Sequence, residues 1–145
     1  MNCYILVLES VPYLWYTSSM DKDSCLIYEG EHYILEWYYD EDGYSQAYEY
    51  FLETSDVQKR KFLMLAKKMG DFGIIYDKSK FRNEGDSVYA FKPQPDRYLC
   101  FFFSGKKIIV TNAYQKKSNK LPKGEKELAL KNMAKYKLRH NETNQ

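Results

Sequence analysis

The residues of this chain that could do chemistry are cations and a tyrosine in its C-terminal half. Lys92 ends one predicted strand, Arg97 begins the next, and Tyr114, Lys116 and Lys117 lie at or just beyond the end of a third. An arginine offers a fork of donors to a phosphate, a lysine offers a point charge, and a tyrosine ring can stack on a base. Because the end of one strand meets the start of its neighbour in a meander, these positions can converge at one edge of a sheet. The pattern predicts a site for a polyanion.

Further lysines extend this charge on both sides of the cluster. Lys106 and Lys107 lie at a predicted turn, and Lys120 and Lys123 precede the last predicted helix. We assign these four lysines to nucleic-acid binding, because lysines neutralise backbone phosphates. A run of charge is also typical of a solvated face, and this alternative stays open.

The distribution of charge along the chain favours a cationic binding face. The 145 residues carry 22 Lys plus Arg and 20 Asp plus Glu, a formal net charge of +2. Residues 1–57 hold one basic and twelve acidic residues, a net −11, whereas residues 58–145 hold 21 basic and eight acidic ones, a net +13. The predicted site lies wholly in the basic part, so we expect that part to meet the polyanion.

Other kinds of site find little support in the sequence. Neither His32 nor His140 has a partner at a ligand spacing, and the three cysteines lack a CxxC pair, so no metal and no cofactor is expected. Cys100 lies in an apolar run and is expected to be inert packing. The apolar stretch 4–16 is too short to span a bilayer and lacks the basic start of a signal peptide. We expect a cytoplasmic protein without membrane contact.

Length and a hydrophobic content of 44% predict one globular domain with its own core. Aromatic and β-branched runs with short connectors predict a first strand or hairpin and, after a loop over 71–86, an antiparallel meander of three strands. The middle strand of the meander is apolar without alternation, so it should be covered on both faces. The strands are expected over residues 26–28, 33–39, 88–92, 98–103 and 107–114.

Helical periodicity appears in three places. Ser45 caps a predicted helix over 45–53, and Ser55 or Asp56 caps a second one that ends at Gly70. Because only two or three residues separate these helices, we expect an antiparallel helical hairpin. A last helix is expected over 123–139. The fold class is therefore α+β: a small antiparallel β-sheet packed by an N-terminal helical hairpin, with a C-terminal helix.

We divide the chain into an N-terminal extension without assigned structure (1–31), one compact domain (32–140) and a mobile tail (141–145). The polar stretch 17–24 separates two short apolar runs and contains Met20. One hypothesis is that natural translation begins at Met20. The alternative, an ordinary edge strand, stays open.

The region from about Tyr33 to Arg139 resembles the phage-derived HigB-like branch of the RelE/ParE toxin superfamily. The most specific part is an aromatic-x-Lys-Lys pattern followed by Lys-x-Pro, between a last strand and a last helix. The segments that carry the resemblance are Asp40–Gly43, Met69–Gly73, Val88–Lys92, Asp96–Phe103, Asn112–Lys117 and Lys120–Lys123.

The resemblance implies a compact RelE-like fold and a metal-independent endoribonuclease of a bacterial type II toxin-antitoxin system. Such toxins cleave mRNA, commonly at the ribosome, by attack of a ribose 2′-OH on the adjacent phosphate. By position, Lys92 and Arg97 would stabilise the phosphate, and Tyr114 would stack or orient. Lys116 and Lys117 would bind the backbone or assist proton transfer. The implied partners are mRNA, the ribosome and a cognate antitoxin, often a helix-turn-helix protein.

A second hypothesis belongs to a different class of protein. A relative with this fold could bind without cleaving, either as a prophage-derived nucleic-acid-binding protein or as a ParE-like inhibitor of a protein target such as gyrase.

Overall fold

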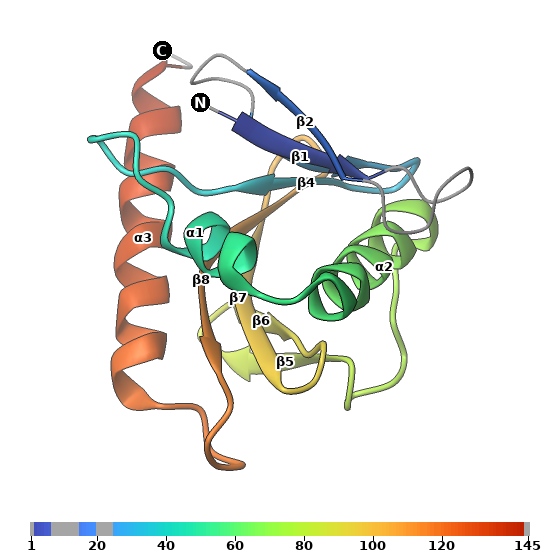
Figure 1. Ribbon diagram of the computed structural model, residues 1–145. Coiled ribbons are helices and arrows are strands. Elements are labelled where there is room, and N and C mark those ends of the chain that lie inside the picture. The colour runs from blue at the N-terminus through green and yellow to red at the C-terminus, as the bar shows by residue number, and fades with distance from the viewer. Residues whose placement is uncertain (1, 7–14, 20–24, 144–145) are drawn as a thin grey trace.

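A computed structural model describes residues 2–6, 15–19 and 25–143 of the chain (Figure 1). A six-stranded sheet with the order β3-β4-β8-β7-β6-β5 forms its centre, and β1 and β2 pair in a small sheet of their own. The described elements are β1 (Asn2–Leu6), β2 (Trp15–Ser19), β3 (Leu26–Glu29), β4 (Ile34–Trp37), α1 (Gln46–Glu53), α2 (Asp56–Phe72), β5 (Phe81–Gly85), β6 (Val88–Phe91), β7 (Asp96–Phe103), β8 (Lys107–Gln115) and α3 (Lys123–Thr143). The predicted α+β class and C-terminal helix are confirmed.

The central sheet is mixed, so the prediction of an antiparallel sheet is wrong. The meander β6-β7-β8 and the β3–β4 hairpin are antiparallel, as expected. β4, however, pairs with β8 in parallel, with Ile34 opposite Lys107 and Trp37 opposite Val110. Hydrophobic patterns do not encode strand direction across so long a connection. All of the chain from α1 to β7 lies between these two strands, which is far more than a hairpin turn requires.

The helices α1 and α2 form where they were predicted, because local caps begin them. The backbone N–H of Tyr48 donates to Ser45 Oγ, and Ser55 forms a reciprocal capping box with Gln58. They do not form the predicted antiparallel hairpin. α1 packs against β8, whereas α2 packs against β3 and β4 at another part of the same sheet face (Figure 1). Each helix buries its apolar face mainly on the sheet, and the two helices meet where the rings of Phe51 and Phe62 are centred 5.9 Å apart.

The end of α2 differs from the expectation at Gly70. The helix runs through Gly70 to Phe72 and ends at Gly73, whose positive φ of 78° forms the left-handed cap. Gly70 is required for close packing instead, because a Cβ atom there would lie 2.8 Å from the Tyr28 ring and 3.2 Å from the Tyr33 carbonyl oxygen. The Gly70 carbonyl also accepts hydrogen bonds from the backbone N–H groups of His32 and Tyr33. The β3–β4 turn thus rests directly on the α2 backbone.

Two hydrophobic clusters cover the two faces of the sheet. On the α1–α2 face, Trp37, Phe62 and Tyr98 stack, with the rings of Phe62 and Tyr98 centred 4.0 Å apart. On the other face, α3 packs Met133 and Tyr136 against β7. The middle strand of the meander is buried on both sides, as predicted, and Cys100 is buried packing. These layers hold β7 and β8 rigidly between helices.

Several boundaries lie elsewhere than expected. The predicted loop 71–86 contains β5, which pairs with β6 and adds an outer strand to the sheet. α3 continues to Thr143, so the predicted tail 141–145 begins in a helix. Among the described residues of the N-terminal region, β1 and β2 pair only with each other, and Met20 lies outside those residues. Within the described part of the chain, none of the helices combines the length and apolarity needed to cross a bilayer.

Candidate phosphate-binding site

Adjacent strand ends bring four of the predicted residues together. Arg97 on β7 lies opposite Tyr114 on β8, and Lys92 follows the end of β6 directly. With Lys116, these side chains line one polar cavity of about 170 Å³. The predicted convergence of strand ends accounts for this arrangement, because the connector from residue 93 to 95 turns β6 back into β7.

Arg97 is held in place by its own connector. It is 7% exposed, and its Nη1 donates to the Gln94 side chain (3.2 Å) and to the Asp96 carbonyl (2.9 Å). Within the described residues both recorded hydrogen bonds use Nη1, which leaves the other guanidinium donors for a ligand. Burial lowers the pKa of Arg97, but a guanidinium remains charged in proteins. The site therefore holds a fixed, partly desolvated cation.

Lys92 is a second cation with an acidic neighbour. Its Nζ lies 3.8 Å from a carboxylate oxygen of Glu84, and the two side chains are 13% and 16% exposed. Burial lowers the pKa of Lys92, Glu84 opposes this shift, and the charges of Arg97 and Arg82 add to the lowering. Lys92 therefore releases its proton more readily than an exposed lysine.

Tyr114 lies between two hollows. It lines the 170 Å³ cavity and also a second cavity of about 480 Å³, bordered by Gln46, Tyr50 and Lys117. Burial raises the pKa of Tyr114 to about 12, an effect that Arg97 opposes. At neutral pH its hydroxyl is thus protonated and can donate a hydrogen bond.

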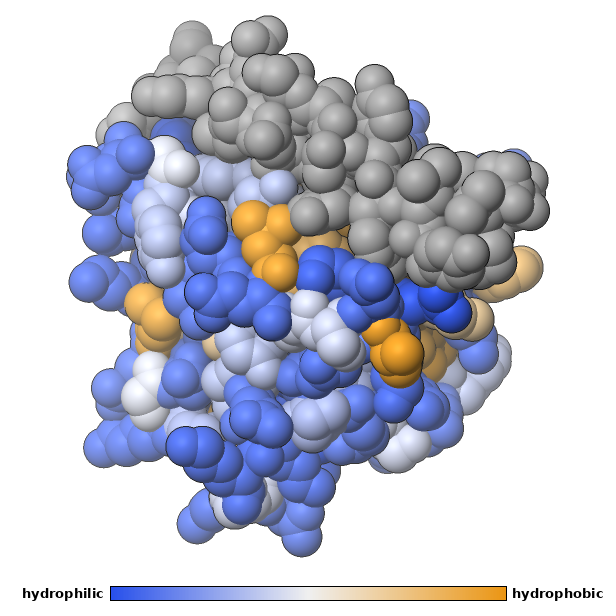
Figure 2. All heavy atoms as spheres, viewed as in Figure 1, coloured by the Kyte–Doolittle hydropathy of each residue, from blue (hydrophilic) through white to orange (hydrophobic). Residues whose placement is uncertain are grey.

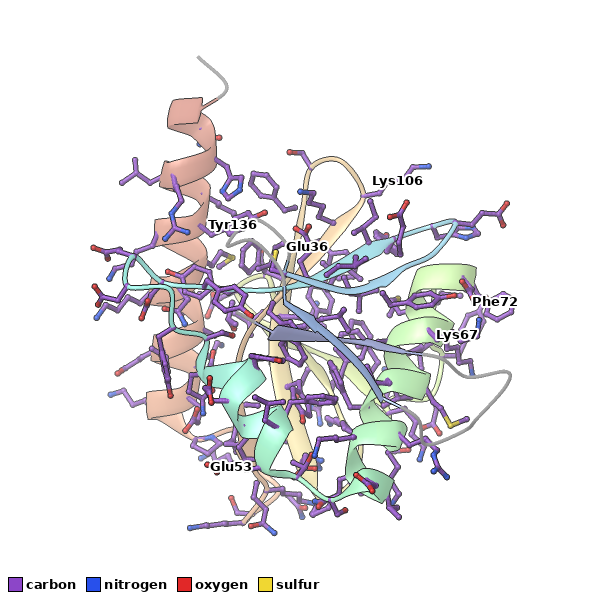
Figure 3. The ribbon with its side chains drawn as sticks, turned by 45° about the horizontal axis from the view of Figure 1, so that its top comes forward. Glu36, Glu53, Lys67, Phe72, Lys106 and Tyr136 are labelled. Atoms are coloured by element: carbon purple, nitrogen blue, oxygen red, sulfur yellow. The ribbon has the colours of Figure 1, made fainter. Side chains whose placement is uncertain are left out.

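The remaining predicted lysines fall into two groups. Lys117 lines the second cavity, Lys120 lines the first, and Lys123 lines a neighbouring cavity of about 480 Å³ that also includes Lys120. Lys106 and Lys107 lie elsewhere, at the β7–β8 turn (Figure 3). Lys107 pairs with Glu36 at 3.3 Å and is seven residues from Tyr114, about 23 Å along an extended strand. The structure does not bring these two lysines to the cavity.

Two residues of the cavity were missed by sequence reasoning. Arg82 and Glu84 line it from β5. The prediction of a loop over 71–86 is wrong at these residues, since Phe81 and the turn around Gly85, before Val88, are compatible with the first strand of a hairpin. A hairpin search that began at Gly85 could have found them.

A buried hydrogen-bond network holds the connector between β6 and β7 in place. Asp96 is 1% exposed and accepts hydrogen bonds from the Tyr50 hydroxyl (2.5 Å) and from Gln58 Nε2 (3.1 Å). Burial raises the pKa of Asp96, while both hydrogen bonds act to lower it. Because Tyr50 lies on α1 and Gln58 on α2, this carboxyl group joins both helices to the start of β7. The helices thus fix the position of Arg97.

Side-chain amides connect the end of β8 to neighbouring helices through hydrogen bonds. Gln46 Nε2 donates to the Ala113 carbonyl, and Gln46 Oε1 accepts from the Ala113 N–H at 2.7 Å. Asn112 is fully buried, and its Nδ2 donates to the carbonyl and carboxylate of Glu125 at 3.1 Å. These bonds position Tyr114 between α1 and the start of α3. Asn112 holds the helix and does not line the cavity.

Metal-ligating side chains do not cluster in the described part of the chain. No group of three or more His, Cys, Asp or Glu residues there could hold a metal ion. The ionisable groups that line the cavity are cations, the carboxylate of Glu84 and the phenol of Tyr114.

The comparisons with known proteins add one match. Residues 49–134 match the family model of phage-derived Gp49-like proteins (DUF891). This span contains α1 from Glu49, α2, the whole meander and the first half of α3. A search of curated proteins finds no relative of the chain.

Proposed function

Since the chain belongs to the phage-derived Gp49-like family, part of the RelE/HigB-like toxin superfamily, we propose that it is the toxin of a bacterial type II toxin-antitoxin system. We propose further that it is an endoribonuclease that cleaves mRNA without a metal. The observation that carries this proposal is the convergence of Lys92, Arg97, Tyr114 and Lys116 on one polar cavity. Such a cavity suits a phosphodiester group, whose charge it offsets.

The proposed reaction is an internal transesterification. The ribose 2′-oxygen attacks the adjacent phosphorus, an O2′–P bond forms, and the P–O5′ bond breaks. The products are a 2′,3′-cyclic phosphate and a free 5′-hydroxyl. Arg97 and Lys92 stabilise the charge that develops on the non-bridging oxygens, and buried cations do this better than exposed ones because the dielectric around them is lower.

Proton transfer falls to the remaining groups of the cavity. The Glu84 carboxylate accepts the 2′-OH proton, and Lys92, whose pKa burial lowers, donates a proton to the leaving 5′-oxygen. Tyr114 stays protonated, with a pKa of about 12, and donates a hydrogen bond to the phosphate. The cavity thereby supplies a base, an acid and two cations without a histidine.

The flanking RNA follows the cations beside the cavity. Lys116, Lys117, Lys120 and Lys123 contact the backbone on either side of the cleaved bond, and the Tyr114 ring stacks on a neighbouring base. The proposed partners are mRNA, the ribosome that carries it, and a helix-turn-helix antitoxin that holds the toxin inactive.

The decisive experiment uses the purified chain and an RNA oligonucleotide, free and bound to ribosomes. Cleavage in the presence of EDTA, with a 2′,3′-cyclic phosphate detected by mass spectrometry, supports the proposal. A substrate with one 2′-deoxy nucleotide at the cut site is the matched control and stays intact. Cleavage of this control contradicts the 2′-OH mechanism.

Expression in a bacterial host separates the alternative class of function. New mRNA ends that accompany growth arrest support the nuclease. Arrest with DNA damage and intact mRNA overturns it in favour of a ParE-like inhibitor of gyrase. Binding to RNA without any cleavage identifies a non-catalytic nucleic-acid-binding protein.

A further inference from the structure

Large hydrophobic side chains lie exposed on α2 and on the segment that follows it. Phe72 is 68% exposed, and Figure 3 shows it pointing away from the sheet. Figure 2 shows hydrophobic atoms over α2 within a mainly hydrophilic surface. The exposed hydrophobic residues of this region are Val57, Met64, Phe72, Ile74 and Tyr76. Several exposed hydrophobic side chains gathered on one element are candidates for a contact surface.

Along α2, part of this group alternates with lysines at a regular spacing. Val57, Lys61, Met64, Lys68 and Phe72 follow one another at intervals of four, three, four and four residues, and all five are exposed. At about 100° per residue they fall within a strip about 80° wide, on the side of α2 opposite its buried face. We call these five residues the α2 stripe. Intervals of three and four are those by which one helix packs along another.

The charge of the α2 stripe is positive. Ion pairs recorded among the described residues involve neither Lys61 nor Lys68, and Lys61 reaches only the Gln94 carbonyl at 3.5 Å. Residues 56–80 hold seven basic and three acidic residues, and one of the acidic ones, Asp71, is already bound by Lys67. A complementary surface therefore carries carboxylates between apolar side chains.

We propose that the α2 stripe docks an acidic amphipathic helix of a partner protein. Apolar residues of that helix pack against Val57, Met64 and Phe72, and its carboxylates face Lys61 and Lys68. α2 has 17 residues and is about 25 Å long, so a helix of four to five turns matches its whole length. The proposal does not depend on RNA cleavage.

Two other occupants fit the α2 stripe less well. A second copy of the chain, docked through the same stripe about a twofold axis, places lysines against lysines. RNA would use the two lysines and leave three large apolar side chains without a partner. An acidic helix satisfies both kinds of residue.

The test uses a synthetic helical peptide as the probe. The peptide has leucine at alternating intervals of three and four residues and glutamate at the flanking positions, and a second peptide replaces each glutamate with lysine. Fluorescence anisotropy with the full chain should show binding of the glutamate peptide and at least tenfold weaker binding of the lysine peptide, as expected for like charges. The double variant Lys61→Glu, Lys68→Glu should reverse this preference. Met64→Ala and Phe72→Ala should each weaken binding about tenfold.

Matched controls lie on α3. Leu138 is 63% exposed and Lys131 is exposed, so Leu138→Ala and Lys131→Glu repeat the same changes away from the stripe and should leave the affinity within twofold. Far-UV circular dichroism checks that each variant is folded. Equal binding of both peptides, or equal affinity in the charge-reversed variant, overturns the proposal. So does self-association of the chain that Met64→Ala abolishes in sedimentation.

Discussion

Both ends of the β7–β8 hairpin carry cationic side chains, but in different surroundings. At the open end, Arg97 is buried and shares a cavity with Tyr114 and Lys116. At the turn, Lys106 is exposed and Lys107 is paired with Glu36. At the open end, cations from several strands lie together, whereas the two lysines at the turn belong to the turn itself. A cation becomes a candidate for catalysis where neighbouring elements bury it and leave some of its donors unused.

The largest expected difference between the two ends concerns the arginine. Arg97→Ala should lower kcat/KM for RNA cleavage by about 10²–10³-fold, because a preorganised donor to the developing charge is lost. Lys107→Ala should change it less than about threefold, since this lysine is bound to Glu36 far from the cavity. Steady-state cleavage of one defined oligonucleotide measures both. Equal losses in the two variants would erase the distinction between the ends.

The pH dependence of cleavage should report Lys92. Activity should fall on the alkaline side as Lys92 loses its proton, below the ordinary lysine pKa of 10.5, because burial lowers the pKa of this group. Arg82 contributes to this lowering, so Arg82→Gln should move the alkaline limb to higher pH. The same profile for Lys106→Ala serves as the control and should not move. A shift of the limb to lower pH in Arg82→Gln would contradict the assignment to Lys92.

The buried support of the open end should show in stability. Tyr50→Phe removes a donor to buried Asp96 and should destabilise the fold by about 1–3 kcal/mol. Burial raises the pKa of Asp96, so the folded state holds this proton more strongly than the unfolded state does. Its contribution is therefore most favourable below the ordinary pKa of 3.8 and is lost as pH rises through the raised value.

Denaturant unfolding at a series of pH values measures this contribution. The free energy of unfolding of the wild type, relative to Asp96→Asn, should fall across that acidic window and stay constant above it. A relative stability that rises with pH there would show that the hydrogen bonds from Tyr50 and Gln58 outweigh burial.

The smallest expected effects concern salt. Lys116→Ala should reduce the slope of log affinity for single-stranded RNA against log salt concentration by about 0.7, the contribution of one phosphate contact. Lys106→Ala should leave the slope unchanged, because that side chain extends from the turn. Titrations at several salt concentrations provide the comparison. A change of similar size in both variants would mean that RNA follows the whole hairpin.

Local signals explain what the sequence predicted correctly. Ser45 and Ser55 cap helices through contacts with residues three positions ahead, and short connectors require the meander. The convergence of Lys92 with Arg97 follows from the same short connector. These features depend on neighbours in sequence, so a single sequence carries them.

Long-range contacts explain what the sequence did not predict. The parallel pairing of β4 with β8 joins strands about 70 residues apart, and no local pattern marks it. Glycine is typical of helix ends, but Gly70 lies inside α2, where its backbone packs against Gly30, 40 positions away in the chain. Glu84 reaches the cavity only because β5 pairs with β6. Each of these depends on tertiary packing.

The strand order of the sheet also determines at which point of synthesis the sheet can be completed. β8 lies between β4 and β7 although it is the last strand of the sheet along the chain, so before its insertion the sheet consists of two separate halves. Insertion of such a strand is a non-local and therefore slow step of folding. When only the residues before 107 have left the ribosome, Arg97 is available to the fold but Tyr114 is not. Newly made protein therefore remains without its candidate site until Tyr114 and Lys116 have left the ribosome.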